Sequence, residues 1–296
     1  MKYCMCSTWA KEHKVLPVLQ MAQGLGLDGI ELWSGHVAGY LAEGHTLSEL
    51  KALMDEMGLE CVVIAPYLNL IDAAGLETNM AEAETCIRYA QALSCKMVRV
   101  FLGDKASNEM TKQEWRTCET ALRTLCDKAA QAGVTLVLEV HNDQPTDTKE
   151  AILRVLRLIK HPALRLIFDG FNFYPSGLEM MDAYAPLKPY SVHYHFKNLL
   201  WDPHVCVPLD EGDVDFRPLI RALRRDGYDG YISFEYFAAD PSAMIRASKD
   251  WFCRVYSEDQ NKQHTKMKRH HSYEGITEHS VTMTNRSERK TKRQQK

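Results

Sequence analysis

The feature that most constrains the fold is a regular alternation of short apolar runs with longer stretches of helical apolar spacing. The short runs cover residues 2–6, 29–33, 60–65, 97–101, 135–139, 165–169, 191–195 and 231–235. Parallel strands must be joined by crossover connections, usually helices, so this alternation predicts a parallel sheet. Eight strand–helix units in roughly 250 residues match the size of a closed (β/α)₈ TIM barrel.

Helix signals between the runs support the alternation. Thr46 with Glu49 and Thr111 with Glu114 have the spacing of capping boxes, and Asp240-Pro241 predicts the start of a last helix over residues 241–256. The alternative is an open doubly wound sheet. That fold favours a glycine-rich phosphate loop after an early strand, and the sequence has none there. We therefore predict a single TIM barrel over residues 1–257.

Charge separates a tail from this barrel. Residues 258–296 hold 10 of the 36 Lys and Arg residues and 5 of the 39 Asp and Glu residues, so the remainder carries about −8. The tail is too poor in apolar residues to form a core, so we expect a disordered basic tail over residues 258–296. An acidic barrel disfavours a nucleic-acid partner, because phosphate backbones attract basic surfaces.

The nine cysteines are scattered and contain no Cys-x-x-Cys pair. Most lie in apolar stretches, which is typical of reduced core thiols and favours a cytoplasmic location. The N-terminal residues lack the apolar core of a signal peptide, and no apolar run is long enough to span a membrane. We expect no membrane partner, and the sequence leaves a homo-oligomer open.

Four consecutive predicted strands end in residues that can bind a metal ion. They are Glu139, Asp169, His195 and Glu235. The carboxyl ends of barrel strands form the active-site face, so these side chains should meet there. Three carboxylates that close would repel one another without a cation. Oxygen-rich ligands with one imidazole suit one divalent ion, namely Mn²⁺, Mg²⁺ or Co²⁺, with Zn²⁺ as a further candidate.

Separate roles as helix caps or rim salt bridges are the simpler interpretation of any one of these acids, but four on consecutive strands favour the metal site. On the seventh strand, His193 shares the inward parity of His195 but lies one pleat deeper. We therefore choose His195 as the ligand.

These residues resemble the xylose-isomerase-like TIM-barrel superfamily of sugar and sugar-phosphate isomerases, epimerases, dehydratases and some endonucleases. The resemblance lies in the Glu ending strand five, Asp-x-x-Asn172, His-x-Lys197-Asn and the final Glu235. Within it, the chain is similar to the metal-dependent 3-dehydroshikimate dehydratases. The matching stretches include Ile-Glu-Leu-Trp33-Ser-Gly-His36, Pro-Tyr67-Leu, Val-Arg99-Val, Glu139-x-His141 and His-Tyr-His195-Phe-Lys197-Asn.

The resemblance implies that Glu139, Asp169, His195 and Glu235 hold the metal, that His141 and Lys197 are catalytic, and that Tyr67 and Arg99 contact the substrate. We also expect substrate contacts from Trp33 and His36 at the end of strand two, and from Asn172. Packing against a neighbouring loop is the alternative for Trp33 and His36, and a rim salt bridge is the alternative for Arg99. The chain departs from those dehydratases in two places. Asn172 stands where they tend to carry His, and the segment over residues 199–209 is shorter.

Under the dehydratase interpretation, the metal polarises a ketone and steadies an enolate, while His141 acts as the general base. Lys197 stabilises the enolate and Arg99 binds a carboxylate of the substrate. Under the isomerase or epimerase interpretation, the metal binds an open-chain ketose, and Glu139 and Glu235 also carry protons on opposite faces of it. Both use an enolate-type intermediate and a small polyhydroxy carbonyl substrate. A repair endonuclease and a non-catalytic barrel are the remaining classes.

Overall fold

The computed structural model describes residues 1–258 of the 296-residue chain. The predicted basic tail, apart from Glu258, therefore lies outside the described residues. Residues 1–251 form one compact unit, and a second unit begins at residue 252. The predicted domain boundary at residue 257 stays a prediction.

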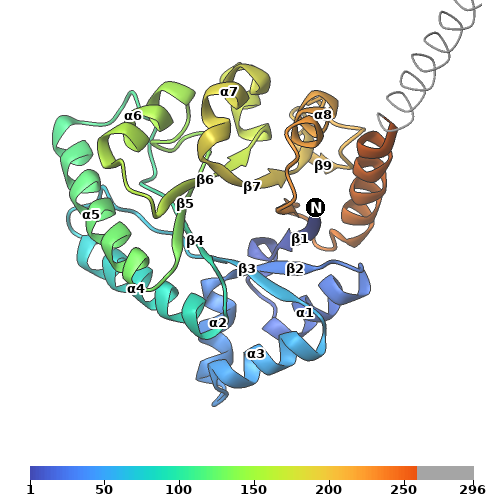
Figure 1. The fold of residues 1–296 in the computed structure, drawn as a ribbon, viewed down its shortest axis with the longest axis horizontal. Coiled ribbons are helices and arrows are strands. Elements are labelled where there is room, and N and C mark those ends of the chain that lie inside the picture. Colours follow the sequence, from blue (N-terminus) through green and yellow to red (C-terminus); the bar gives the residue numbers. More distant parts are fainter. Residues whose placement is uncertain (259–296) are drawn as a thin grey trace, which may run out of the picture. The chain divides into compact units, whose positions relative to one another are not determined.

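The first unit contains the predicted closed barrel of parallel strands, in the order β1-β10-β7-β6-β5-β4-β3-β2 (Figure 1). The strands are β1 Lys2–Cys6, β2 Gly29–Trp33, β3 Glu60–Ala65, β4 Met97–Val100, β5 Thr135–Glu139, β6 Leu164–Asp169, β7 Ser191–Phe196 and β10 Tyr231–Phe234. Closure occurs where β1 pairs with β10, from Lys2 opposite Tyr231 to Met5 opposite Phe234. The fold prediction is confirmed, with strand boundaries shifted by one residue in several places.

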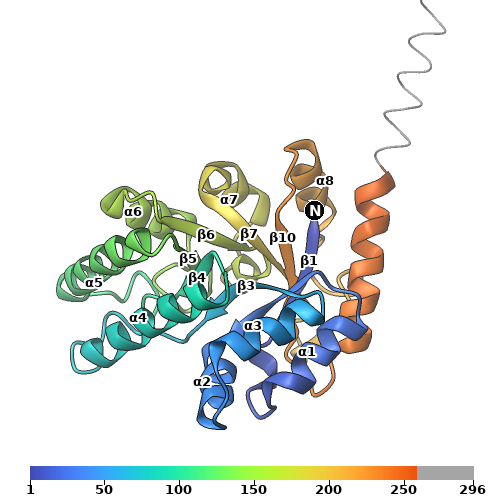
Figure 2. The ribbon, with the colours of Figure 1, turned by 60° about the horizontal axis from the view of Figure 1, so that its bottom comes forward.

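The helices lie around the outside of the strands (Figures 1 and 2). They are α1 Val15–Gly24, α2 Ser34–Ala42, α3 Leu47–Glu56, α4 Leu76–Ala92, α5 Lys112–Gln131, α6 Lys149–Ile159, α7 Met180–Leu187 and α8 Arg217–Arg225. Short 3₁₀ turns cover Thr8–Ala10, Phe171–Ser176 and Lys188–Tyr190, and residues 242–258 are helical. Both predicted capping boxes form, and Asp240 accepts the backbone N–H of Ser242 at the start of the last helix.

Two parts of the chain differ from the sequence-based prediction. Two helices, α2 and α3, stand between β2 and β3. His36 therefore lies in α2 and does not end strand two, because β2 stops at Trp33 and helix α2 starts at the next residue. In addition, an antiparallel hairpin follows β7, formed by β8 Asn198–Leu200 and β9 Val205–Val207. This hairpin overlaps residues 199–209, the segment that the sequence analysis expects to be shorter than in the dehydratases.

Strand residues of the barrel form a buried apolar cluster. It contains Cys4, Val62, Val63, Val137 and Ile167. All nine cysteines are free thiols, and seven of them are buried. Side chains at the carboxyl ends of the strands therefore stand on a packed, water-excluding base.

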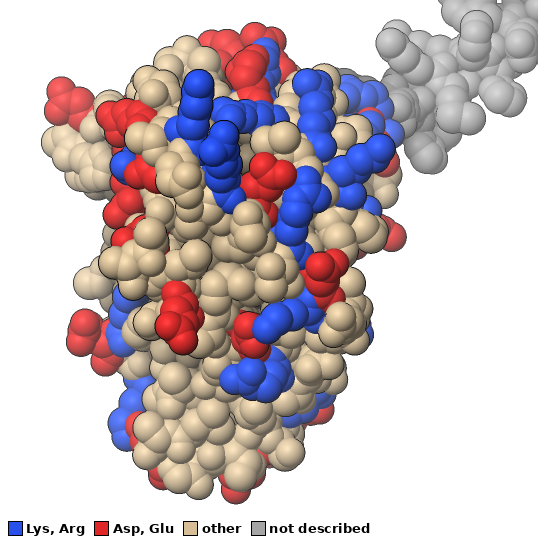
Figure 3. Space-filling model, turned by 90° about the vertical axis from the view of Figure 1, so that its left-hand side faces the viewer, with Lys and Arg blue, Asp and Glu red and all other residues tan. Residues whose placement is uncertain are grey.

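The outer surface carries mixed charge on the face shown in Figure 3, where basic and acidic side chains lie among uncharged ones. Ion pairs between helices contribute to this pattern, for example Lys128 of α5 with Glu84 of α4. Among the described residues, no helix is both long enough and apolar enough to cross a membrane.

Candidate active site

The structure brings the four predicted metal-binding residues together. Glu139 and Asp169 are the last residues of β5 and β6, His195 lies next to the end of β7, and Glu235 directly follows β10. Each offers one ligand atom, and these atoms all lie within 4.8 Å of one another. None of the four side chains is more than 4% exposed. The strands therefore converge as the barrel geometry requires.

The imidazole of His195 points one nitrogen at the three carboxylates. Its Nδ1 lies 3.4 Å from Glu139 Oε1, 3.7 Å from Glu235 Oε2 and 3.9 Å from Asp169 Oδ2. This Nδ1 is buried and has no hydrogen-bond partner. A buried polar atom without a partner is rare in folded proteins. A cation between the imidazole and the carboxylates would satisfy it.

The other nitrogen of His195 meets a carboxylate that the sequence analysis did not assign to the site. The Nε2–H of His195 donates to Glu31 Oε1 at 2.9 Å, and the Nε2–H of His193 donates to the same oxygen at 2.7 Å. Glu31 lies in β2, and neither it nor the two histidines has any exposed surface. His193 thus lies two residues before His195 on β7, deeper in the barrel, as predicted, and contacts Glu31.

Two buried cations lie against the carboxylates. Arg99 Nη1 is 3.0 Å from Glu139 Oε2, and Arg99 Nη2 donates to the backbone oxygen of Pro66. Lys197 Nζ bridges Asp169 Oδ2 at 2.6 Å and Glu235 Oε2 at 2.7 Å. Arg99 is therefore already committed to a candidate ligand.

The charges of this cluster do not balance when both histidines are neutral. Four buried carboxylates, those of Glu31, Glu139, Asp169 and Glu235, face only the cations of Arg99 and Lys197. Uncompensated buried charge is strongly unfavourable. The excess of two negative charges equals the charge of one divalent ion, so the donor set fits such an ion in number and in kind.

The same contacts shift the proton affinities of the groups. Burial alone would raise the pKa of every carboxyl here, but Arg99 holds the pKa of Glu139 below its usual value, and Lys197 does the same for Glu235. For Asp169, burial prevails and raises the pKa. The carboxylates hold the pKa of Lys197 above its usual value despite burial. Lys197 is therefore an ammonium ion and not a base.

His141 lies two residues beyond Glu139 and is half-buried. Its Nδ1–H donates to the backbone oxygen of Asn142 at 2.6 Å, and its ring contacts Phe101 edge-on. Because Nδ1 carries the proton in this bond, Nε2 presents a lone pair. This tautomer is the one that a general base requires, and the assignment of His141 as that base stays a prediction.

The predicted substrate contacts lie in different environments. Tyr67 is 42% exposed and its ring lies beside the Arg99 guanidinium. Asn172 is buried and donates to the backbone oxygen of Val140. His36 is 3% exposed, and its two nitrogens bond to Ser7 and to the backbone oxygen of Ala10. The hydrogen-bonding capacity of His36 is thus used within the protein.

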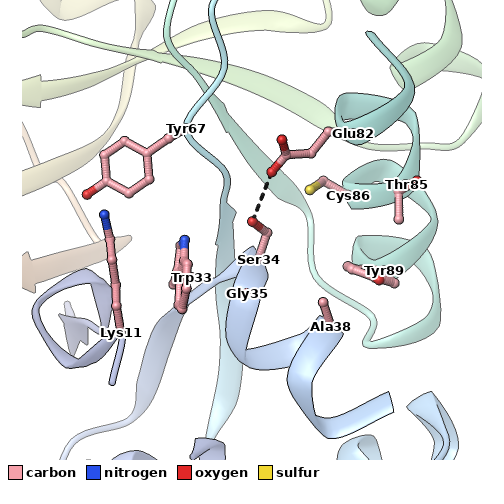
Figure 4. Close-up of a pocket in the computed structure, with 10 residues that line it drawn as sticks. All are labelled: Lys11, Trp33, Ser34, Gly35, Ala38, Tyr67, Glu82, Thr85, Cys86 and Tyr89. Atoms are coloured by element: carbon pink, nitrogen blue, oxygen red, sulfur yellow. Dashed lines mark hydrogen bonds between the residues drawn. The ribbon is translucent and has the colours of Figure 1, made fainter. Parts of the chain in front are cut away.

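A cleft of about 540 Å³ opens beside Tyr67 and Trp33 (Figure 4). Lys11, which the sequence analysis did not single out, lies on it directly after the 3₁₀ turn that follows β1. Its ammonium lies 3.8 Å from the centre of the Tyr67 ring and 5.7 Å from that of Trp33. Across the cleft, Ser34 donates to Glu82 of α4. Lys11 forms no ion pair with the part of the chain that the structure describes.

Comparison with known proteins identifies relatives along nearly the whole described chain. The profile of the family described as xylose isomerase-like TIM barrel matches residues 19–255. The 3-dehydroshikimate dehydratase of Bacillus anthracis is 29% identical over 269 residues, covering 83% of this chain and 95% of the relative. The L-ribulose-5-phosphate 3-epimerase UlaE of Escherichia coli K12 is 23% identical over 250 residues, covering 79% and 87%.

Among solved structures, the probable 3-dehydroshikimate dehydratase AsbF from Bacillus anthracis has a TM-score of 0.76 with this chain at 26% identity. The match covers 84% of this chain and 98% of that one. The named relatives are enzymes of two kinds, a dehydratase and an epimerase.

Proposed function

The chain belongs to the xylose isomerase-like TIM barrel family, and from this premise we propose that it is a divalent-metal-dependent 3-dehydroshikimate dehydratase. Its relatives support an enzyme, and the finer assignment is the proposal. The reaction would convert 3-dehydroshikimate to protocatechuate and water. The observation that carries the metal dependence is the unpartnered Nδ1 of His195 facing Glu139, Asp169 and Glu235.

Glu139, Asp169, His195 and Glu235 would hold the ion. A divalent ion at this position supplies Lewis-acid stabilisation of negative charge on a substrate oxygen. The excess of two negative charges supports a single ion, because one divalent cation neutralises it. Mn²⁺, Mg²⁺ and Co²⁺ suit the oxygen-rich donor set, and Zn²⁺ is a further candidate.

His141 would remove the proton next to the ketone of the substrate. Its Nδ1–H is held by the backbone oxygen of Asn142, so Nε2 is the atom that takes the proton. The protonated His141 would return that proton to the departing β-hydroxyl, which leaves as water, and transfer of a ring proton to the ketone oxygen would complete the aromatic ring. Lys197 would stabilise the negative charge that develops on the substrate oxygen, since its ammonium lies among the candidate ligands.

The carboxylate of the substrate would bind at Lys11 and Tyr67. The sequence analysis assigned this role to Arg99, but Arg99 is buried and bonded to Glu139. Lys11 carries a cation in the cleft beside Tyr67 and forms no ion pair with the described residues, and Trp33 and Tyr67 offer flat surfaces next to it. Arg99 would instead orient Glu139, with which it forms an ion pair.

An absorbance assay tests the proposal. Protein stripped with EDTA and reloaded with Mn²⁺ or Mg²⁺ is mixed with 3-dehydroshikimate, and the catechol product is followed in the near ultraviolet. We expect product only with the ion present, and none from Glu139→Ala or Asp169→Ala. Glu119→Ala, on the surface of α5, is the matched control and should keep full rate. Absence of product from metal-loaded wild type would reject the dehydratase assignment.

Epimerisation of a ketose or ketose phosphate is the second candidate. It is supported by the similarity to the L-ribulose-5-phosphate 3-epimerase and by the two departures from the dehydratases, at Asn172 and in the segment of the β8–β9 hairpin. Glu139 and Glu235 would then carry protons on opposite faces of the sugar. Exchange of solvent deuterium into L-ribulose 5-phosphate by the metal-loaded protein would identify this reaction, and Lys11 would face its phosphate.

A further inference from the structure

Glu31 is a carboxylate without exposed surface inside the barrel. It lies on β2, whereas its hydrogen-bond partners His193 and His195 lie on β7. These strands are not neighbours, because β1 and β10 separate them in the barrel. Glu31 therefore reaches across the barrel interior to the side chain of a candidate metal ligand.

The contact determines which nitrogen of His195 faces the carboxylates. A carboxylate only accepts hydrogen bonds, so at 2.9 Å from Glu31 Oε1 the Nε2 of His195 must carry a proton. In the neutral ring, which is the form that binds a metal ion, the opposite nitrogen, Nδ1, then offers its lone pair toward Glu139, Asp169 and Glu235. Metal-binding histidines commonly donate their second N–H to a carboxylate or carbonyl in this way.

A contribution to folding stability does not explain why a carboxylate stands at position 31. In β3, Val63 stands in register with it, and Ile167 of β6 stands in register with His193. An apolar side chain would suit this layer, since removing a charge from water is unfavourable even when it is paired. One oxygen of Glu31, Oε2, has no hydrogen-bond partner at all. A carboxylate retained at such a position points to a role in the site.

We propose that Glu31 is a positioning residue that holds His195 with its proton on Nε2 and its Nδ1 toward the ion, while His193 holds the carboxylate of Glu31 in place. This inference rests on the proposed metal site. It predicts that Glu31 affects the affinity of the site for the ion and the position of the proton on the His195 ring. It assigns Glu31 no contact with the substrate.

A competing use of Glu31 is defined by a second cluster. Ligand atoms of Cys4, Glu31 and His193 also lie within 4.8 Å of one another, and all three residues are buried. In this cluster His193 Nε2 and Glu31 Oε1 are bonded to each other at 2.7 Å, while Glu31 Oε2 and His193 Nδ1 have no hydrogen-bond partner. The number of ions bound per chain separates the two uses: positioning requires one, and a second site requires two.

Glu31→Gln is the informative variant. It keeps the shape of the side chain, but its amide can donate to His195 Nε2 and thereby favour the proton on Nδ1, which blocks coordination. Titration of the stripped, folded protein with Mn²⁺ or Zn²⁺ should give about 10- to 100-fold weaker binding than wild type. Glu31→Asp, which keeps the acceptor, should recover part of the loss. Ser233→Ala removes a buried hydroxyl from the strand next to β7 and should bind as wild type.

The second readout is the ring proton itself. In the Zn²⁺-loaded wild type, ¹⁵N-labelled histidine should show an exchange-protected Nε2–H signal from His195, identified by its loss in His195→Gln. Glu31→Gln should lose or shift that signal. A residue with only a structural role would lower the melting temperature but leave the dissociation constant of the folded protein unchanged.

The outcomes are distinct. Equal ion affinity in wild type and folded Glu31→Gln would overturn the positioning role and leave the metal site intact. Two ions per wild-type chain, with one lost in Glu31→Gln, would overturn it in favour of the second cluster. Absence of any bound ion in wild type would overturn both this inference and the proposed function.

Discussion

Replacement of Arg99 by methionine tests the charge balance of the site most directly. Arg99 and Glu139 are each 1% exposed and form an ion pair at 3.0 Å. Removing one partner of a buried pair typically costs about 3–5 kcal/mol, because the other charge stays buried without compensation. For a domain of this size, 1 kcal/mol corresponds to about 2–4 °C. The metal-free variant should therefore melt roughly 6–20 °C below wild type.

The bound ion should reduce this difference. Without Arg99, the carboxylates of the site exceed the remaining cation, Lys197, by three charges instead of two when the histidines are neutral. A divalent ion then relieves a larger imbalance in the variant than in wild type. The rise in melting temperature on adding Mn²⁺ should thus be larger for Arg99→Met than for wild type.

Differential scanning calorimetry with EDTA and with saturating Mn²⁺ measures both effects. Lys51→Met is the control: its pair with Asp55 on α3 is solvent-exposed, and such pairs contribute only about 0–1 kcal/mol. It should melt close to wild type in either condition. The reasoning would be refuted if Arg99→Met lost as much stability with Mn²⁺ as with EDTA, or if its loss matched that of Lys51→Met.

Four further outcomes are expected. Lys11→Ala should raise KM for the anionic substrate about 10- to 100-fold with a smaller change in kcat, whereas Lys14→Ala, whose cation pairs with Glu43 at 3.1 Å, should leave KM unchanged in the same steady-state assay. His141→Ala should bind Mn²⁺ normally by titration yet lose about 10²–10⁴-fold in kcat; an unchanged rate would exclude it as the base. EDTA should abolish turnover and lower the melting temperature, and added Mn²⁺ should restore both; activity surviving verified removal of the ion would contradict the metal dependence. Burial raises the pKa of Cys118 and Cys126 to about 12 each, so few of these thiols are ionised at pH 8. Mass spectrometry should therefore find iodoacetamide adducts on them only after unfolding in urea.

The residues that could be predicted from sequence are those with a local signal. Glu139, Asp169 and Glu235 each close or directly follow an apolar run, and strand-end position alone brings them to one face of a barrel. The choice between His193 and His195 followed from the alternation of side chains along a strand. The structure places all of these residues where that logic requires.

The residues that escaped prediction depend on contacts between distant parts of the chain. In the sequence, Glu31 is a single polar residue within Gly-Ile-Glu-Leu-Trp, and its hydrogen-bond partner His193 is 162 positions away. An acid at an inward position of a barrel strand was the only available signal. His36 was misplaced because a helix starts directly after Trp33 without a turn signal. For Arg99 a salt bridge at the rim was the alternative to substrate binding, but its buried pairing with Glu139 depends on the register of β4 with β5.

The pairing of β1 with β10 has a consequence for the order of events during synthesis. The first strand leaves the ribosome early, but its barrel partner and Glu235 emerge only after residue 230. A nascent chain that stops before β10 has an open sheet, an unpaired edge on β1 and three of the four candidate ligand side chains. We therefore expect capture of the ion to follow closure of the barrel, so that the finished cavity, and not the growing chain, selects the metal.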